Sequence, residues 1–298
     1  MLPIYRLYIN NIFNSDREDA MRLTDAQMAA YEEQGYLVFP DLVSREEVEI
    51  LRRDLMRVTG IENEGVIREK SGTVRTVFRV HDEQSPTASP PFQALATLPR
   101  VIDPARQVLG DEPVYVYHTK CNLKDAIDGA IWQWHQDYGY WKTDGVDRPD
   151  MTTSLLMLDE ATEIGGCLYF IPGSHKLGRL DPEMDETTTS YKLWTVPKDQ
   201  VIDMMRRFGD PVAITGKPGT VVLFHPNIVH GSGHNMSRHS RWHIYTVYNQ
   251  VSNRPHGIEN PRPEWVVARN CEALATGSDD GILHQAGSDV DVRRPAAE

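Results

Sequence analysis

The spacing of apolar residues divides the chain into a helical first third and a β-rich remainder. Two capping boxes, Thr24 with Gln27 and Ser44 with Glu47, stand at the start of stretches with helical apolar spacing. They predict two helices, ending near glycines 35 and 60, with a short strand over residues 36–39 between them. This part of the chain predicts a layer of helices packed against a sheet.

The next segment is harder to assign. Residues 61–91 have poor periodicity and several Gly and Pro residues, so this segment is either disordered or a lid over a site. If it is a lid, Arg75, Arg79 and His81 are possible substrate contacts. Residues 92–109 regain helical spacing and predict a further helix, closed by a glycine.

From residue 113 onward, short β-rich runs alternate with turn residues. Such a succession predicts an antiparallel sandwich or barrel, since the only strong amphipathic helix among the runs covers Lys198 to Phe208. The fold class is therefore mainly β with flanking helices. The seven candidate strands cover residues 114–123, 130–138, 151–158, 167–173, 211–216, 219–226 and 241–251.

Chain length and composition favour one domain. The 298 residues suit a single β domain with helical additions, which we place at residues 21–270. Residues 1–20 precede the strong structural signals and are expected to form a flexible extension. Residues 271–298 are rich in Gly, Asp, Ser, Arg and Pro, and are expected to form a flexible tail. The sequence does not determine the oligomeric state.

Charge and cysteine content restrict the function. The 31 basic and 43 acidic residues give a net charge of −12, which argues against nucleic acid or an anionic membrane as the partner and leaves a small molecule. Cys121, Cys167 and Cys271 show neither a disulfide framework nor zinc-thiolate spacing, so a reducing cytoplasmic location is expected. No stretch reaches the roughly 18 apolar residues of a spanning helix.

The candidate chemistry lies in the sequence WQWHQDYGYW, residues 132–141. On a strand over residues 132–138, His135 and Asp137 point to one face and could share a metal ion, because buried charges are usually paired or metal-bound. A salt-bridged surface strand is the alternative. The third ligand is a histidine of FHPNIVHGSGHN, for which His230 competes with His225 and His234.

Arg241 favours His230 among these histidines. Arg241 begins an alternating strand, and if the face that it shares with His243 and Tyr245 lines a barrel interior, a guanidinium lies on the metal's side and needs an anion. A carboxylate held by two donors would satisfy it. Two histidines and one carboxylate with open positions suit non-haem Fe(II).

The combination of HQD, Gly-Gly, IPGSHK and HGSGHN, with Arg241 eleven residues after His230, resembles the phytanoyl-CoA dioxygenase family of Fe(II)- and 2-oxoglutarate-dependent oxygenases. The motifs are most similar to those of the ectoine hydroxylase branch, over roughly residues 24–255. The resemblance implies a double-stranded β-helix, a jelly roll of the cupin type. It also implies His135, Asp137 and His230 as iron ligands, Arg241 as the anchor of 2-oxoglutarate, and O2 as the oxidant.

The resemblance carries over to further positions. It implies that Asn122 and Ser232 help to hold 2-oxoglutarate, that Lys120 lies near co-substrate or substrate, and that Trp141 belongs to the substrate pocket. Tyr138 and Tyr140, beside it, are candidates to enclose the substrate.

The chain also departs from the branch. Lys120 replaces the arginine of ectoine hydroxylases, and YGYWKTDGVDRP replaces their sequence after the iron motif, which favours a substrate other than ectoine. Lys120, Lys142 and Arg148, with Arg75 or Arg79, could make the entrance of the site positive and so favour a carboxylate- or phosphate-bearing molecule.

The expected reaction is hydroxylation of an unactivated C–H bond of a small polar metabolite, with release of succinate and CO2. The same oxidative chemistry could instead end in desaturation, epimerisation or ring closure. A different class also stays open, namely a non-oxidative cupin-like metal enzyme or a ligand-binding protein. Arg241 discriminates, because neither of these needs an inward-facing anion clamp.

Overall fold

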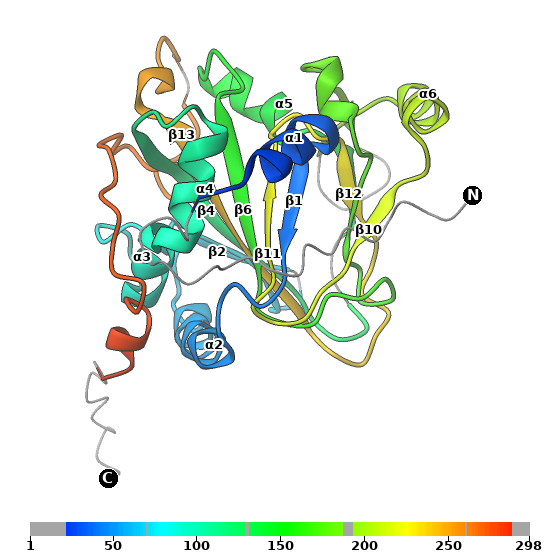
Figure 1. The fold of residues 1–298 in the computed structure, drawn as a ribbon. Coiled ribbons are helices and arrows are strands. Elements are labelled where there is room, and N and C mark those ends of the chain that lie inside the picture. Colours follow the sequence, from blue (N-terminus) through cyan, green and yellow to red (C-terminus); the bar gives the residue numbers. More distant parts are fainter. Residues whose placement is uncertain (1–21, 70, 129–130, 187–192, 260, 288–298) are drawn as a thin grey trace.

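A computed structural model describes residues 22–69, 71–128, 131–186, 193–259 and 261–287. Two antiparallel sheets face each other, and the helices α2, α3 and α4 cover the outer face of the larger sheet (Figure 1). The strands are β1 (Tyr36–Phe39), β2 (Val66–Arg68), β3 (Val74–Phe78), β4 (Val114–Lys124), β5 (Trp132–His135), β6 (Met151–Met157), β7 (Leu168–Phe170), β8 (Glu183–Asp185), β9 (Leu193–Thr195), β10 (Val212–Ile214), β11 (Val221–Phe224), β12 (His230–Ser232) and β13 (Arg241–Gln250).

The helices begin where the sequence supplies caps or prolines. Both predicted capping boxes are present, at Thr24 and Ser44, and Gly35 ends the first helix in the left-handed conformation. The α-helices are α1 (Asp25–Gln34), α2 (Arg45–Thr59), α3 (Pro90–Thr97), α4 (Pro99–Val108), α5 (Asp137–Trp141) and α6 (Lys198–Phe208). Short 3₁₀ helices are η1 (Lys142–Asp144), η2 (Ser174–Leu177), η3 (Val251–Asn253) and η4 (Leu283–Gly287).

The strand order is that of a double-stranded β-helix, which confirms the predicted fold class. The larger sheet has the order β1-β11-β6-β13-β4-β3-β2, and the smaller one has the order β10-β7-β12-β5. Every pair is antiparallel, and β8 and β9 form a separate two-stranded sheet. One core fills the space between the sheets, where Leu155 and Phe224 of the larger sheet pack with Phe170 and Ile214 of the smaller.

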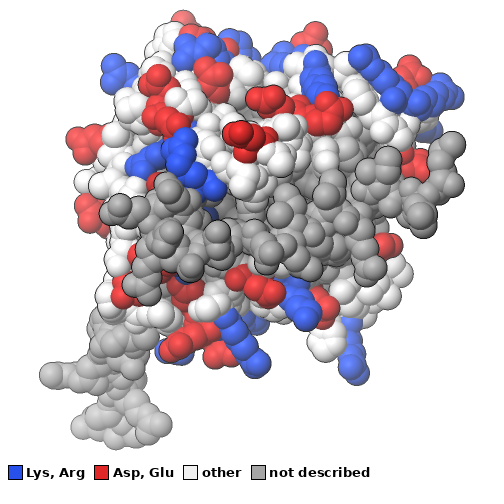
Figure 2. All heavy atoms as spheres, viewed as in Figure 1, with Lys and Arg blue, Asp and Glu red and all other residues white. Residues whose placement is uncertain are grey.

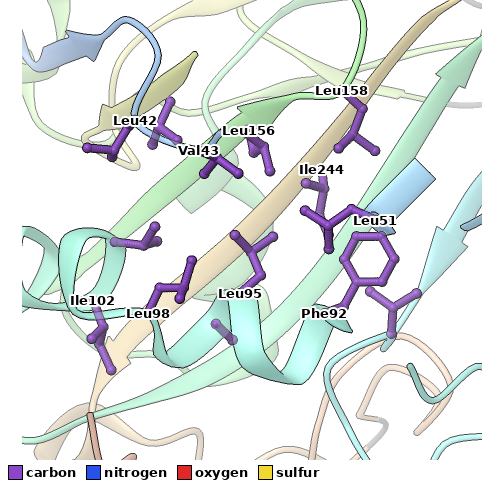
Figure 3. Close-up of a cluster of buried hydrophobic side chains, with 14 of the residues drawn as sticks. Leu42, Val43, Leu51, Phe92, Leu95, Leu98, Ile102, Leu156, Leu158 and Ile244 are labelled. Atoms are coloured by element: carbon purple, nitrogen blue, oxygen red, sulfur yellow. The ribbon is translucent and has the colours of Figure 1, made fainter. Parts of the chain in front are cut away.

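A second core lies between the larger sheet and the helices. Because side chains alternate along a strand, Leu155 points between the sheets while Leu156 points outward. Figure 3 shows Leu156 and Ile244 of the sheet facing Leu51 of α2 and Leu95 of α3. Burial of this apolar surface holds the helices to the sheet.

Shortening Leu51 to alanine is expected to destabilise this helical layer. The side chain is fully buried, so the substitution leaves a cavity and should cost roughly 2 to 5 kcal/mol of unfolding free energy. Met56→Ala on the same helix is the matched control, because Met56 is 60% exposed and its truncation should change stability by about 0.5 kcal/mol or less. Equilibrium urea unfolding measures both; equal effects would contradict the assigned packing.

Two predicted element boundaries were wrong. The helix predicted over residues 92–109 is two helices, because Pro99 cannot continue a helix and disfavours helical geometry at the preceding Leu98. The strand predicted over residues 130–138 ends at His135, where the chain turns into the short helix α5. The second change alters how the metal-binding motif is built.

The uncertain segments take part in the fold. Within residues 61–91, β2 and β3 extend the larger sheet beside β4, so the disordered alternative does not hold for the described part. Within the expected tail, the Leu274 N–H donates to the Val114 carbonyl at 2.8 Å, and Ile282 is fully buried against the helices. The proposed extension, residues 1–20, lies outside the described residues.

Basic and acidic side chains are interspersed over the face seen in Figure 2, without a continuous basic area. In the part of the chain that the structure describes, no helix has the length and apolar character needed to cross a membrane.

Candidate metal centre and co-substrate cavity

Three side chains converge at the edge of the smaller sheet. His135 ends β5, and its antiparallel partner on β12 is His230, so the two imidazole rings lie 4.2 Å apart between centroids. Asp137 follows at the start of α5, and its Oδ1 lies 3.8 Å from His135 Nε2. One ligand atom from each residue lies within 4.8 Å of the other two. Within the described residues this is the single His, Cys, Asp and Glu group with such spacing.

Backbone carbonyls set the orientation of both rings. His135 Nδ1 lies 2.7 Å from the Gln133 carbonyl, and His230 Nδ1 lies 3.0 Å from the Ile228 carbonyl. Because a carbonyl only accepts, each Nδ1 carries the hydrogen and each Nε2 keeps its lone pair. Burial, followed by the neighbouring His230, lowers the pKa of His135, so its ring is neutral as a metal ligand must be. The donor set fits Fe(II).

The motif is built differently from the regular strand that its spacing suggested. Gln136 is buried between the ligands and holds two loops, since its amide donates to the Gly178 and Asn227 carbonyls at 2.9 and 2.7 Å. His230 and Ser232 are two positions apart on β12, whereas their partners His135 and Trp132 are three positions apart on β5, so β5 contains one extra residue, a β-bulge. The bulge turns Trp132 toward the metal site, although simple alternation placed it on the opposite face.

The two rival histidines lie elsewhere. His225 packs against Tyr31 and His175, and its Nδ1 accepts the Asn227 N–H at 3.0 Å. His234 is exposed beyond the end of β12. Neither joins the group of three converging ligand atoms.

Beyond the lining residue Tyr245, the inner face of β13 carries a buried guanidinium and a buried imidazole that are incompletely hydrogen-bonded. Arg241 is 1% exposed and donates from one terminal nitrogen to the Gly166 carbonyl at 3.0 Å, while its Nε and its other terminal nitrogen have no partner. Both ring nitrogens of the fully buried His243 also lack partners. Buried donors are rarely left unpaired, so this region is built to receive a polar ligand.

Ser232 and Asn122 lie on the strands that flank this region. Asn122 is the cross-strand partner of His243, and its side-chain oxygen accepts from the Thr76 hydroxyl at 3.2 Å. Ser232 Oγ accepts from Lys124 at 2.9 Å. Arg241, Ser232 and Asn122, predicted from separate motifs, thus come from three strands of two facing sheets.

Sequence reasoning missed Lys124. It is 2% exposed, it lies opposite Arg241 in the β4–β13 pairing, and burial, followed by the charge of Arg241, lowers its pKa to about 6. The signal was present, because Lys120, Asn122 and Lys124 alternate along one strand and therefore share a face. No local pattern indicated that this face is the inner one as far as residue 124.

A cavity of about 280 Å³ joins the metal ligands to the outside. Its lining includes all three candidate ligands, together with Arg75, Lys120, Trp132, Tyr140, Trp141 and Arg262. Lys120 Nζ lies 3.8 Å from the Trp132 ring centroid, and the Arg75 guanidinium lies 4.8 Å from it. Burial lowers the pKa of Lys120 to about 7, and the nearby Asp137 carboxylate opposes that shift.

The structure separates the predicted substrate residues into two groups. Tyr140 and Trp141 line the cavity, and Trp141 packs edge-to-face on His118, a further lining residue. Tyr138 does not, because its ring is buried in an apolar cluster and its hydroxyl donates to the Val146 carbonyl at 3.0 Å. It packs beneath the site, because α5 turns successive side chains by about 100°, whereas a strand alternates them.

Four predicted substrate contacts, three of them cationic, also lie outside the cavity lining. Each has another partner: Arg79 and Arg148 form ion pairs with Asp82 and Asp150, Lys142 pairs with Asp147, and His81 Nδ1 lies 3.0 Å from the Thr119 hydroxyl. Arg262, which sequence reasoning did not single out, lines the cavity from the C-terminal segment and pairs with Asp144. The positive charge at the cavity therefore comes from Arg75, Lys120 and Arg262.

Comparison with known proteins gives a consistent result. Residues 31–242 match the family profile described as phytanoyl-CoA dioxygenase. The ectoine dioxygenase of Sphingopyxis alaskensis is 32% identical, with 92% of each chain covered. The L-proline trans-4-hydroxylase of Streptomyces griseoviridis is 35% identical, with 83% of this chain and 93% of the relative covered. The crystal structure of the S. alaskensis protein EctD with 2-oxoglutarate and 5-hydroxyectoine superposes with a TM-score of 0.73 at 30% identity, covering 89% and 90% of the two chains.

The double-stranded β-helix and the cavity with its two histidines and one carboxylate define a non-haem iron oxygenase. The chain belongs to the phytanoyl-CoA dioxygenase family. It is an Fe(II)- and 2-oxoglutarate-dependent dioxygenase of the hydroxylase type, and it uses O2.

Proposed function

We propose that His135, Asp137 and His230 hold the iron and that Arg241, with Ser232 and Asn122, holds 2-oxoglutarate, so that the enzyme hydroxylates a small, carboxylate-bearing metabolite. One observation carries this proposal. The three converging ligand residues line a cavity, and the inner face of β13 leads from the lining residue Tyr245 to Arg241, a buried guanidinium with two nitrogens that lack a hydrogen-bond partner. A metal site alone does not need this clamp, whereas a chelating dianion does.

When bound, iron with 2-oxoglutarate and O2 supplies the oxidising power for R–H + 2-oxoglutarate + O2 → R–OH + succinate + CO2. The protein's part is to position the reactants. Along β4 and β13 the inner face presents Lys124 with Arg241 at one level, Asn122 with His243 at the next, and Lys120 with Tyr245 beyond them. This order supports a co-substrate lying toward Arg241 and a substrate lying toward the level of Lys120.

Aromatic side chains close the substrate side. Trp141 is 2% exposed, and the Tyr140 hydroxyl accepts the Trp194 N–H at 2.7 Å, which ties α5 to β9. With Trp132, these rings exclude water from the C–H bond to be oxidised. Their rigid placement restricts which carbon of the substrate reaches the metal.

The charge of the lining supports an anionic substrate. Arg75, Lys120 and Arg262 surround a space in which Asp137, a proposed iron ligand, is the one acidic side chain of the described lining. The relatives are named for ectoine and L-proline, two small molecules that carry a carboxylate. The lysine at position 120 and the altered sequence after the iron motif favour a substrate other than ectoine.

Succinate release with Fe(II), 2-oxoglutarate and O2 tests the function in a screen of amino acids and related carboxylates, each paired with its neutral amide. We expect stimulation by the acid and little by the amide. Lys120→Met should raise the KM for the acid by roughly tenfold or more, the worth of one charge-assisted hydrogen bond, and leave the KM for 2-oxoglutarate nearly unchanged.

Two results would contradict this assignment. Equal stimulation by acids and amides would contradict the proposal of an anionic substrate, but it would not contradict the assignment as an oxygenase. Failure of the wild-type protein to bind 2-oxoglutarate in the presence of a divalent metal would contradict the proposed co-substrate site.

A further inference from the structure

The residue between two of the proposed iron ligands is more deeply buried than the ligands themselves. Gln136 is 3% exposed, whereas His135 and Asp137 on either side of it are half-buried. Its backbone is extended, with φ −113° and ψ 134°, and neighbouring side chains of an extended chain point to opposite faces. The Gln136 amide therefore points away from the ligand side chains, and it does not line the cavity.

Three hydrogen bonds fix this amide. One N–H donates to the Asn227 carbonyl at 2.7 Å, the other donates to the Gly178 carbonyl at 2.9 Å, and the side-chain oxygen accepts the Leu180 N–H at 2.8 Å. A glutamine amide has two N–H groups, and both are used. Because a buried, fully bonded amide is held in one orientation, Gln136 fixes its own backbone relative to two loops.

The turn that carries Asp137 depends on such contacts, because neither a cap nor a strand sets it. Asp137 is the first residue of α5, and no side chain of the described residues caps the start of this helix. Strand pairing does not reach it, since β5 ends two residues earlier. The Tyr138 N–H donates to the Pro226 carbonyl at 3.0 Å, beside the bond from Gln136 to Asn227. The turn is therefore docked on this one loop.

The same loop orients the third proposed ligand. The Ile228 carbonyl lies 3.0 Å from His230 Nδ1 and accepts its hydrogen. The loop thus sets the orientation of the His230 ring, and Gln136 joins the turn at Asp137 to that loop. The two histidine ligands are already joined by strand pairing, so the position that depends on Gln136 is that of the carboxylate.

We propose that Gln136 is a positioning residue of the metal centre: it joins the turn at Asp137 to the loop before His230 and so holds the carboxylate where one metal ion can bind all three ligands. This inference rests on the proposed function, because it takes the three ligands as assigned there. Gln136 contributes through the placement of Asp137 and is not itself a ligand. Its loss should therefore weaken metal binding and change the coordination geometry without removing a ligand.

Gln136→Met tests this role, since methionine has a similar length and forms none of the three hydrogen bonds. Calorimetric titration of the metal-free full chain with Mn(II) should give a Kd roughly 10- to 100-fold above that of the wild type, the range for loss of a group that supports metal ligands. With Co(II) as a spectroscopic probe, the visible absorption of Gln136→Met should differ from that of the wild type, because the carboxylate is displaced. Neither measurement depends on turnover.

Asn253→Leu is the matched control. Asn253 is also 3% exposed, and its amide donates to the Arg148 carbonyl at 2.7 Å and to the Asn249 side-chain oxygen at 2.9 Å, but it does not line the cavity. Because a buried, hydrogen-bonded amide is lost in both variants, the melting temperature of the metal-free protein should fall in both. The Kd for Mn(II) and the Co(II) spectrum should stay unchanged in Asn253→Leu alone.

Gln136→Asn provides a second variant and replaces Gln136→Met if the latter does not fold. Asparagine keeps the amide but is one methylene shorter, so it cannot reach all three partners, and a smaller rise in the Kd for Mn(II) is expected. An unchanged Kd or Co(II) spectrum in a folded Gln136 variant, or an equal loss of affinity in Asn253→Leu, overturns the positioning role. If the wild-type protein itself does not bind Mn(II), the proposed metal centre fails instead.

Discussion

His135→Ala is expected to abolish iron binding and, with it, succinate formation. His135 contributes one of three ligand atoms that lie within 4.8 Å of one another, and its ring is held by the Gln133 carbonyl. Loss of a ligand should exceed the roughly 10- to 100-fold loss of metal affinity that follows loss of an outer-sphere hydrogen bond. Anaerobic calorimetry with Fe(II) measures the affinity, and metal analysis after gel filtration measures the retained iron.

His234→Ala is the matched control for this prediction. His234 lies in the same HGSGHN segment as His230 and was a rival ligand on sequence grounds, but it is exposed and outside the converging group. We expect normal iron content in this variant. Retention of stoichiometric iron by His135→Ala, or its loss from His234→Ala, would show that the ligand set has been assigned wrongly.

Arg241→Ala should cause the second large effect, a rise in the 2-oxoglutarate requirement. Truncating one partner of a buried, hydrogen-bonded charge pair costs roughly 2 to 5 kcal/mol, which corresponds to about a 30-fold or greater increase in Kd. Iron affinity should stay close to that of the wild type, because Arg241 does not belong to the group of converging ligand residues. Titration of 2-oxoglutarate into the Mn(II)-loaded protein measures this effect without turnover.

Two variants make the Arg241 result specific. Arg241→Lys keeps the charge but loses the two-pronged geometry, so it should bind 2-oxoglutarate more weakly than wild type and more tightly than Arg241→Ala. Arg206→Ala removes a guanidinium that is 75% exposed and pairs with Asp203 on the surface, and it should have no effect. An unchanged 2-oxoglutarate affinity in Arg241→Ala would show that the anion clamp lies elsewhere.

Much of the fold followed from local patterns. The capping boxes at Thr24 and Ser44 predicted two helix starts, because the groups that satisfy the free backbone donors lie within three residues of each other. Alternating β-rich runs predicted an antiparallel β fold, and the strand pairs bear this out. Element ends were predicted less well. The break at Pro99 has a local cause that the continuous helical spacing obscured, whereas the turn after His135 is not marked by the alternation of its strand.

Only the tertiary structure decided what completes the site. The bulge in β5 that turns Trp132 inward, the burial of Tyr138 away from the cavity, and the arrival of Arg262 from the C-terminal segment depend on pairings and contacts between distant residues. Lys124 is the clearest case, because its alternation with Lys120 was visible but its register opposite Arg241 was not. The sequence by itself determined the β fold and the motifs that suggested its chemistry, because these depend on neighbours along the chain. The order in which Arg241 and Lys124, His243 and Asn122, and Tyr245 and Lys120 pair along the inner face required the folded sheets, because strand register cannot be read from one strand alone.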